Sequence, residues 1–303
     1  MSSEVLSVVV VAYAMARELP RTLRTLAPGY QRDLDGVEVE IVVVDNGSPE
    51  PVRRDDLTEE PGVRLLRIDD ADPSPVAAAN AGVSVARGDL IGLFVDGARM
   101  ASPGLLAGAR RAARLVHEPV ITAPAFHLGP VPHMRASEVN YDQRTEDRLL
   151  TEIGWEDNGY RLFRASVLGG SSSRGLFGVK GESNSLFLRR HTWERLGGMD
   201  ERFALPGGGL ANHDLYRRAC ELDGTTLIEL LGEATFHQYH GGAATSGRFR
   251  WDDMHAEYVA ITGRRHRPPP DVPIHVGTVR TEVLEHVEAS ARSAIDRSLR
   301  NQP

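Results

Sequence analysis

The sequence predicts an α/β fold built on a mostly parallel sheet. Two short runs of β-branched residues, Val8 to Val11 and Ile41 to Val44, have the pattern of strands that are covered on both faces. Between them, Leu19, Leu23 and Leu26 recur at helical spacing. A strand, a helix and a second strand in this order predict parallel pairing through a right-handed crossover. In such sheets, ligands bind at the carboxyl ends of the strands.

The same alternation continues along the chain. We expect a third strand at Val63 to Ile68, a helix of small residues at Val76 to Ala86, and a fourth strand at Leu90 to Val95. After Pro103, a helix rich in Ala and Arg is expected to end near His117. Repeated alternation of this kind predicts a sheet that is flanked by helices.

The second half of the chain shows weaker periodicity. From residue 126 to residue 181, Gly, Pro, Ser and charged residues dominate, which predicts long loops and short helices over one face of the sheet. The proline-rich run from Arg264 to Pro270 breaks regular structure. The remaining expected elements are strands at 119–125, 185–188 and 226–231, a helical turn at 191–196, and helices at 215–222 and within 278–299.

Composition and charge exclude several classes of protein. The 303 residues are 41% hydrophobic and 25% charged, which is ordinary for a globular chain. With 35 basic and 42 acidic residues, the net charge is −7 at pH 7, which opposes binding to nucleic acid and to anionic membranes. The apolar run from Val5 to Ala14 is far shorter than the roughly 20 residues of a membrane span, and the single Cys220 cannot form an internal disulfide. We therefore expect a cytoplasmic protein without a transmembrane segment.

A carboxylate follows each of two predicted central strands. Asp45, followed by Asn46, Gly47 and Ser48, can accept the imide N–H of a uracil or thymine. Asp96, next to a permissive glycine, can hold a divalent cation or a ribose hydroxyl. Each residue also has a purely structural interpretation, Asp45 as a cap of the next element and Asp96 as part of a strand-to-loop turn.

Two histidines stand three positions apart beside a pair of glycines. The imidazoles of His237 and His240 can complete a metal site that a carboxylate elsewhere begins, and Gly241 and Gly242 let the backbone approach a ligand. Each of these histidines could equally be a residue that packs in the core or lies at the surface without binding a metal. The chain has no His-Glu-x-x-His zinc signature, no Walker-type phosphate loop and no Gly-x-Ser-x-Gly nucleophile elbow.

Several short segments follow one another in a characteristic order. They are Ala12-Tyr13, Val44-Asp45-Asn46-Gly47-Ser48, Ala79-Asn80-Ala81-Gly82, Gly88-Asp89, Val95-Asp96 with Pro103-Gly104, Leu196-Gly197-Gly198-Met199-Asp200-Glu201-Arg202-Phe203, Asp214-Leu215 with Arg218, and His240-Gly241-Gly242. In order and spacing they resemble the family 2 glycosyltransferases of the GT-A fold, over about the first 110 residues and, further on, to about residue 245. Each segment is weak evidence alone, whereas their common order is strong evidence.

The resemblance implies a GT-A fold, with a Rossmann-like, mostly parallel mixed sheet flanked by helices, a loop-rich acceptor region and a helical C-terminal tail. It implies one glycosyltransferase domain over residues 1–263, with a nucleotide-binding half at 1–110 and an acceptor and metal half at 126–245. Residues 264–303 would form a proline-rich linker and the C-terminal helix. The implied activity is transfer of a sugar from a nucleotide-diphosphate donor, such as a UDP-sugar, to a hydroxyl of a saccharide or another acceptor.

The resemblance also implies roles for residues of both halves. A departing nucleoside diphosphate develops negative charge, which Mg²⁺ or Mn²⁺ bridging its oxygens stabilises. Asp96 and His240 would hold this ion, with His237 as a further or alternative ligand. The implied nucleotide-binding residues are Ala12, Tyr13, Asp45, Asn80 and Asp96, of which Asp45 would bind the base.

Two positions depart from the family pattern. The Asp-x-Asp metal motif aligns with Asp96-Gly97-Ala98, which lacks the second carboxylate. The Glu-Asp pair that supplies the catalytic base aligns with Ala211-Asn212, and the nearest carboxylate is Asp214. We expect Asp214 to be the base, ahead of Glu182, and His213 is a further candidate. The alternative for Asp214 is an N-cap of the following helix.

Two other functions fit parts of the pattern. A non-catalytic nucleotide-sugar binding protein that retains the GT-A fold would explain the missing carboxylates. A sugar nucleotidyltransferase would need a Gly-rich, basic phosphate loop near the first strand, and none occurs around Tyr13. The sequence leaves open the donor sugar, the acceptor, the stereochemistry and the oligomeric state, a homodimer included.

Overall fold

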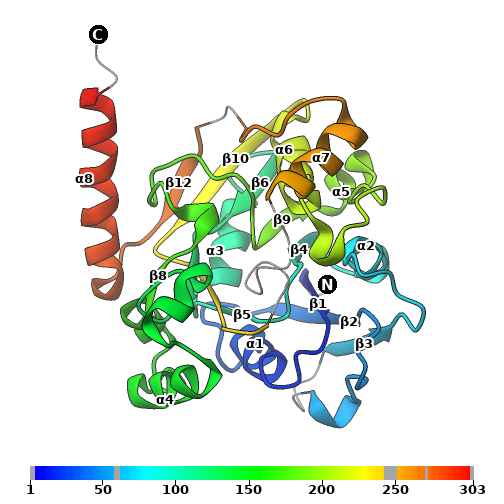
Figure 1. The fold of residues 1–303 in the computed structure, drawn as a ribbon, viewed down its shortest axis with the longest axis horizontal. Helices are drawn as coiled ribbons and strands as arrows, with labels where there is room; N and C mark the ends of the chain where they lie inside the picture. Colours follow the sequence, from blue (N-terminus) through cyan, green and yellow to red (C-terminus); the bar gives the residue numbers. More distant parts are fainter. Residues whose placement is uncertain (1–3, 58–61, 242–250, 270–271, 301–303) are drawn as a thin grey trace.

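The computed structural model describes residues 4–57, 62–241, 251–269 and 272–300. Within them, an eight-stranded sheet forms the centre of the molecule, with helices on both faces (Figure 1). In spatial order its strands are β12 (Ile274–Gly277), β10 (Thr225–Leu231), β6 (Glu118–Thr122), β9 (Leu186–Arg189), β4 (Leu90–Phe94), β1 (Glu4–Ala12), β2 (Val37–Asp45) and β3 (Val63–Arg67). All run parallel except β9, which lies antiparallel between β4 and β6. The predicted α/β class and mostly parallel sheet are confirmed.

The side chains of β1 contribute to two separate cores. Val8 and Val10 belong to the core on one face of the sheet, whereas Val9 and Val11 belong to the core on the other. Successive residues of a strand point to opposite faces, so a continuous β-branched run is what a doubly covered strand requires. The first core includes α1 (Leu19–Leu26) and α3 (Leu105–Ala112), and the second includes α2 (Val76–Val85), α5 (Arg190–Leu196), α6 (Ala211–Glu221) and α7 (Trp251–Thr262).

A second, four-stranded sheet begins where β4 ends. Residues 95–98 are all that separate β4 from β5, the first strand of this sheet. In spatial order its strands are β5 (Arg99–Ala101), β11 (Thr235–His237), β7 (Ala125–Leu128) and β8 (Ser166–Leu168). Because β5 follows the carboxyl end of a central strand, the small sheet lies at the edge where α/β proteins bind ligands.

The predictions were most accurate for the first 95 residues, where all four strands and both helices are present. Further on, α3 ends at Ala112 rather than His117, and α6 begins at Ala211 rather than residue 215, because its first turn has no apolar periodicity. Residues 126–181 include α4 (Gln143–Ile153) as well as loops. Strands of three or four residues, such as β5, are too short to show alternation. Short 3₁₀ helices lie at Arg54–Asp56, His133–Val139, Gly159–Ala165, Gly170–Ser172, Pro206–Gly208 and Thr281–Val283.

The C-terminal tail adds a strand to the central sheet and then forms the predicted helix. β12 pairs in parallel with β10 and completes one edge of the sheet. Helix α8 (Leu284–Arg300) stands at the side of the molecule (Figure 1). It is attached through Ser290, whose buried hydroxyl accepts a hydrogen bond of 3.0 Å from the backbone N–H of Leu176. The domain boundary at residue 263 stays a prediction.

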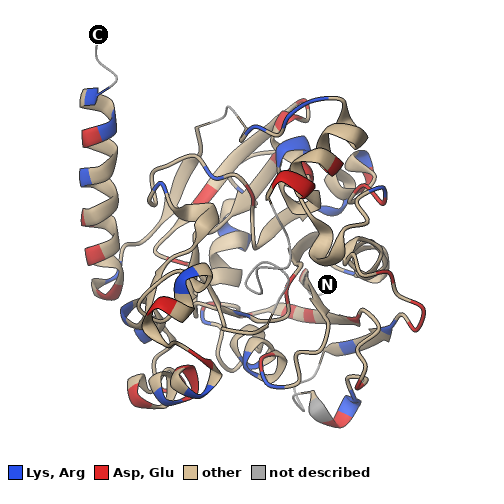
Figure 2. Ribbon diagram, in the orientation of Figure 1, with Lys and Arg blue, Asp and Glu red and all other residues tan. Residues whose placement is uncertain are grey.

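Acidic and basic residues are interspersed on the ribbon, for example along α8 (Figure 2). This distribution agrees with the modest net charge of the sequence. Among the described helices, none combines the length and the apolar character that crossing a membrane requires.

Candidate active site

Three neighbouring strands of the small sheet place polar side chains in one row. His237 of β11 pairs with Arg99 of β5 on one side and with His127 of β7 on the other. Asp96 lies in the short connection that leads from β4 into β5. The topology therefore brings segments that are about 140 residues apart in sequence to one point, at the carboxyl end of a central strand.

The structure brings together the three residues that the sequence predicted as metal ligands. The carboxylate Oδ2 of Asp96 lies 2.7 Å from Nε2 of His237 and 3.5 Å from Nε2 of His240. The two Nε2 atoms are 3.0 Å apart. Burial raises the pKa of Asp96, but the two imidazoles more than offset this and hold it well below its usual range. An ionised carboxylate and two imidazole nitrogens thus converge in a largely buried place.

A third histidine determines which nitrogen of His237 carries the proton. Burial and the neighbouring His237 ring lower the pKa of His133 to about 3, so this ring is neutral at pH 7 and has one N–H. Nε2 of His133 donates that proton to the backbone oxygen of Leu128, 2.9 Å away. Nδ1 of His133 must then accept from Nδ1 of His237, at 3.2 Å. Nε2 of His237 is left with a lone pair directed at Asp96.

This proton arrangement is the physical test of whether the residues fit a cation. A lone pair of His237 and a carboxylate oxygen of Asp96 face each other at 2.7 Å, and Nε2 of His240 lies 3.0 Å from the same nitrogen. A positive charge at this point, either a protonated His240 or a divalent ion, bridges the two acceptors, and imidazole and carboxylate are suitable ligands for Mn²⁺. The residues present therefore fit a metal ion, although the Asp-x-Asp motif is incomplete.

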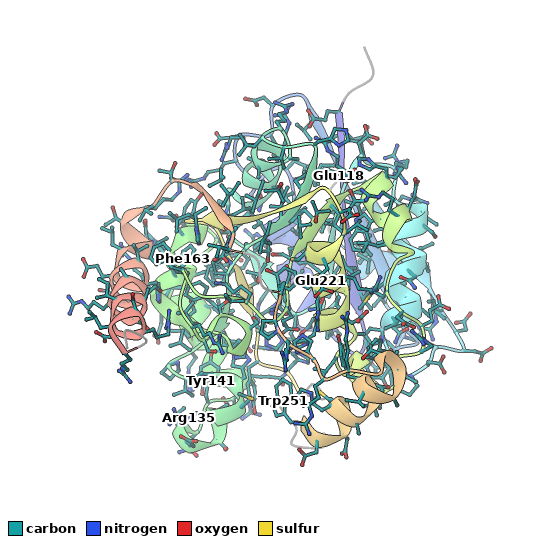
Figure 3. The ribbon with its side chains drawn as sticks, turned by 90° about the horizontal axis from the view of Figure 1, so that it is seen from above. Glu118, Arg135, Tyr141, Phe163, Glu221 and Trp251 are labelled. Atoms are coloured by element: carbon teal, nitrogen blue, oxygen red, sulfur yellow. The ribbon has the colours of Figure 1, made fainter. Side chains whose placement is uncertain are left out.

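Two other histidine groups have metal-like spacing in the described ranges, and their surroundings differ. In the group of His127, His133 and His237, ring nitrogens are already used in hydrogen bonds, since Nδ1 of His127 accepts from the backbone N–H of His133 at 2.9 Å and Nε2 of His133 bonds to Leu128. The group of His117, Glu118 and His191 lies at the amino end of β6, the opposite edge of the sheet. Figure 3 labels Glu118 well away from Tyr141 and Trp251.

Arg99 supplies positive charge beside the proposed metal ligands. Its side chain is 12% exposed, and Nη2 lies 3.8 Å from Oδ2 of Asp96. Nη1 is buried and has no hydrogen-bond partner among the described residues. A buried guanidinium N–H without an acceptor is costly, and phosphate oxygens are well suited to receive it.

The segment that contains His240 is held by a polar clamp from α4. Oε2 of the buried Glu146 accepts from the backbone N–H of Tyr239 at 2.7 Å and from the hydroxyl of Tyr141 at 3.2 Å. Arg17 donates to Oε1 of Glu146 and to the backbone oxygen of Tyr239. Because the clamp fixes Tyr239, it also fixes the neighbouring imidazole of His240.

The loops after β1 and β2 are tied together at the predicted nucleotide site. The buried carboxylate of Asp45 accepts from the backbone N–H groups of Ser48 and Val52 and from Arg67, at 2.9, 3.1 and 2.6 Å. The hydroxyl of Ser48 accepts from the backbone N–H of Ala14 at 2.9 Å. Burial raises the pKa of Asp45, and these hydrogen bonds outweigh it, so the pKa is lowered. In the structure Asp45 therefore organises its own loop.

The other predicted nucleotide-binding residues lie in different surroundings. Ala12 is fully buried at the end of β1, whereas Tyr13 is 53% exposed. Asn80 lies on α2, and its amide exchanges hydrogen bonds of 2.8 and 3.0 Å with the backbone of Met199 and also donates to Glu201. The contacts of all three residues with a nucleotide stay predictions.

The two candidate bases differ in what surrounds their carboxylates. Asp214 lies in the first turn of α6 rather than at its N-cap, and it accepts from Nε of Arg218 at 2.6 Å. Arg218 also donates to the backbone oxygens of Leu196 and Gly198, so this pair joins α6 to the end of α5. Asp214 is 4% exposed and is committed to this ion pair.

Glu182 has a different set of partners. Its Oε2 accepts from Nδ2 of Asn212 at 3.0 Å and lies 3.5 Å from Nδ1 of His213. Burial raises the pKa of Glu182, and the charges of His213 and Arg99 together with hydrogen bonds from Asn212 and Asn184 outweigh that effect, so the pKa is lowered. The influence of Arg99 on both Glu182 and Asp96 links the candidate base to the candidate metal ligands.

Sequence reasoning missed His127, His133 and the clamp residue Glu146. All three lie in the part of the chain that was expected to form loops and short helices. No local pattern marks His127 as a partner of His237, because the pairing depends on the four-residue strand β7.

Comparison with known proteins agrees with the geometry. Residues 7–108 match the family model described as Glycosyl transferase family 2, which covers β1 to α3. This segment is accordingly similar to family 2 glycosyl transferases, and the resemblance is confirmed over these residues. No curated protein sequence matches the chain.

Solved structures of TarS from S. aureus have a similar fold. TarS 1–349 in complex with UDP-GlcNAc has a TM-score of 0.54 at 12% identity, over 84% of this chain and 66% of that chain. The complex with UDP has a TM-score of 0.50 at 13% identity, over 78% and 61%. TarS itself has a TM-score of 0.52 at 11% identity, over 86% and 43%. The chain thus spans less than two thirds of these structures' own length, and the likeness confirms the GT-A fold.

Proposed function

We propose that this chain, which is similar to family 2 glycosyl transferases over residues 7–108, moves a sugar from a nucleoside diphosphate to a hydroxyl group. The convergence of Asp96, His237 and His240 beside Arg99 supports the proposal most, because a diphosphate needs cations at the ligand edge of the sheet. TarS, a structural neighbour, was solved with UDP and with UDP-GlcNAc. A UDP-linked sugar is therefore the donor class that we propose.

The same residues define how a divalent ion would be held. Oδ2 of Asp96 and Nε2 of His237 and His240 would bind Mn²⁺ or Mg²⁺, and the nitrogen ligands favour Mn²⁺. When bound, such an ion stabilises the negative charge of the departing diphosphate. Tyr13, Ala12 and Asp45 would contact the nucleoside.

The chain's own side chains would perform the remaining steps. Glu182, whose pKa is lowered, is ionised at neutral pH and would take the proton of the acceptor hydroxyl. Arg99 would donate its unused N–H groups to the phosphate oxygens as the bond between the sugar and the phosphate breaks. We propose Glu182 rather than Asp214 as the base because Asp214 is paired with Arg218.

Nucleotide binding and donor hydrolysis test the proposal together. UDP with Mn²⁺ is expected to raise the melting temperature, by an amount equivalent to about 2.7 kcal/mol at a ligand concentration of 100 Kd. Excess EDTA should remove most of that gain and most of the slow hydrolysis of a UDP-sugar without acceptor. Binding without any hydrolysis would instead indicate a non-catalytic nucleotide-sugar binding protein. No stabilisation by UDP, GDP or dTDP would contradict the proposal altogether.

Substitution of His133 tests the proton arrangement at the proposed metal site. His133→Ala should lower the affinity for Mn²⁺ about 10–100-fold, the usual cost of losing a residue that orients a metal-bound histidine. The reason is that Nδ1 of His237 loses its acceptor. Titration of Mn²⁺ by electron paramagnetic resonance in the presence of UDP measures the effect.

The exposed His117, which lies at the other edge of the sheet, provides the matched control. His117→Ala should leave Mn²⁺ affinity unchanged, because its side chain is 90% exposed and far from Asp96 in the topology. Equal Mn²⁺ affinity in the wild type and in a folded His133→Ala variant would show that His133 does not orient His237.

A further inference from the structure

One large aromatic side chain near the proposed base is left in water. Trp251 begins α7 and is 55% exposed, whereas Trp155 and Trp193 are 4% and 3% exposed. Figure 3 labels Trp251 at the end of α7 (orange) that lies toward the middle of the view. An indole has a large apolar face and one polar N–H, which suits it to a binding surface where one side of the ring is covered by a ligand.

A single imidazole separates Trp251 from Glu182. The indole and the ring of His213 meet edge to face, with centroids 6.2 Å apart and planes at 87°. Nδ1 of His213 is in turn 3.5 Å from Oε2 of Glu182. Arg99, whose charge lowers the pKa of Glu182, has its Nη2 atom 3.8 Å from Oδ2 of Asp96. The exposed indole of Trp251 and the carboxylate of Glu182 are thus joined through His213, and the charge of Arg99 connects Glu182 with the proposed diphosphate site.

Two histidines of this region have buried ring nitrogens that make no hydrogen bond among the described residues. They are Nε2 of His266 and Nδ1 of His213, whose contact with Oε2 of Glu182 is an ion-pair distance of 3.5 Å. Their rings pack edge to face, with centroids 5.0 Å apart. Buried polar atoms without partners are costly, and a ligand with hydroxyl groups would satisfy them.

We propose that Trp251, His213 and Glu182 form the acceptor subsite and that the acceptor is a pyranose sugar. The inference rests on the proposed function. A pyranose has an apolar face of C–H groups that can pack on the indole, and an edge of hydroxyls that can reach His213 and Glu182. A linear polyol lacks such a face and does not match Trp251.

These groups account for every bond and proton of the transfer step. The acceptor oxygen forms a bond to the anomeric carbon of the donor while the bond from that carbon to the phosphate oxygen breaks. The proton of the acceptor hydroxyl goes to Glu182, and the nucleoside diphosphate leaves with the bonding electron pair. No oxidant, reductant or further reactant is needed.

Tryptophan fluorescence of the full chain with UDP and Mn²⁺ tests the subsite. Because Trp155 and Trp193 are buried, acrylamide quenches mainly Trp251. The probes are methyl glucopyranosides and galactopyranosides, maltotriose and cellotriose, with ribitol as the linear control. At least one pyranoside should protect Trp251 from quenching in a saturable way, and ribitol should not.

Variants of Trp251 give the second readout, with the protecting sugar as acceptor. Trp251→Ala should raise the KM for that acceptor about tenfold, the effect of ~1.4 kcal/mol, while kcat and UDP affinity change little. Trp251→Phe, which keeps an aromatic face, should recover much of the loss. Leu115→Ala is the matched control, because Leu115 is 58% exposed and lies between α3 and the amino end of β6, at the opposite edge of the sheet.

The outcomes separate this inference from the proposed function. If UDP stabilises the protein and no pyranoside protects Trp251, or if Trp251→Ala leaves the acceptor KM unchanged, the pyranose subsite is wrong and the proposed function stands. If UDP does not bind in the presence of Mn²⁺, the proposed function itself fails.

Discussion

Replacing Glu182 by Gln is expected to lower turnover by about 10²–10⁴-fold, the usual contribution of a positioned general base. Glutamine has nearly the same shape and keeps an oxygen that can accept from Asn212, so the fold should persist. The affinity for UDP should also be kept, because Glu182 acts on the acceptor side. Steady-state kinetics and calorimetric UDP titration of the same preparation measure the two effects.

Asp214→Asn is the matched control for this prediction. Asp214 accepts from Arg218, which also holds Leu196 and Gly198, so its loss should lower the melting temperature more than the turnover. The opposite pattern, with normal turnover in Glu182→Gln and a collapse in Asp214→Asn, would transfer the role of base to Asp214.

The spacing of Asp214 and Arg218 explains why sequence and structure favour different candidates for the base. A motif alignment places Asp214 nearest to the family's base, and that argument uses position only. The same two residues stand four apart on a helix, which is the spacing of a surface or structural ion pair. The sequence could therefore have indicated that Asp214 forms an ion pair within its helix. It could not have indicated that the charge of Arg99 acts on Glu182.

The nucleotide-binding half of the fold was predictable because its signals are local. The β-branched run of β1 is continuous over both faces of the sheet, and Asp96 follows a strand of five apolar or glycine residues. Each signal lies within ten residues of the feature that it predicts. The position of Asp96 at the ligand edge then follows from the parallel topology.

The histidine cluster was predictable only in part because its geometry depends on distant pairings. His237 and His240 are near each other in sequence, and their meeting with Asp96 was expected from the family pattern. The support from His133 depends on a 3₁₀ helix and on the alignment of β7 with β11, which pair over three residues. Pairings this short leave no periodic trace in the sequence.

The largest expected effect on stability is at Lys180, the single lysine in a chain with 35 basic residues. Nζ of Lys180 lies 3.0 Å from Oε1 of Glu229 on β10, and both side chains are buried. The ammonium also donates to the backbone oxygens of Gly175, Leu176 and Gly178, at 3.0, 3.4 and 3.1 Å. A compact ammonium can serve several oxygens that surround it, whereas a planar guanidinium cannot.

Lys180→Met is expected to lower the free energy of unfolding by about 3–5 kcal/mol, because it leaves the carboxyl group of Glu229 buried without a counter-charge. Urea unfolding at pH 7, with the midpoint and slope fitted together, measures the loss. Lys180→Arg should also destabilise the protein, although it keeps the charge. Unchanged unfolding of Lys180→Met would contradict the buried ion pair.

The double variant Lys180→Met with Glu229→Leu should recover most of the loss, since replacing both members of a buried pair by apolar residues is often close to neutral.

The pH dependence of wild-type stability gives an independent check on the buried pair. Burial raises the pKa of Glu229, and Lys180 only partly opposes it. As the pH rises from the usual glutamate pKa toward this raised value, the folded chain keeps a proton that the unfolded chain has released, so wild-type stability falls. The double variant lacks this carboxyl group, and its free energy of unfolding should therefore fall less over the same pH interval.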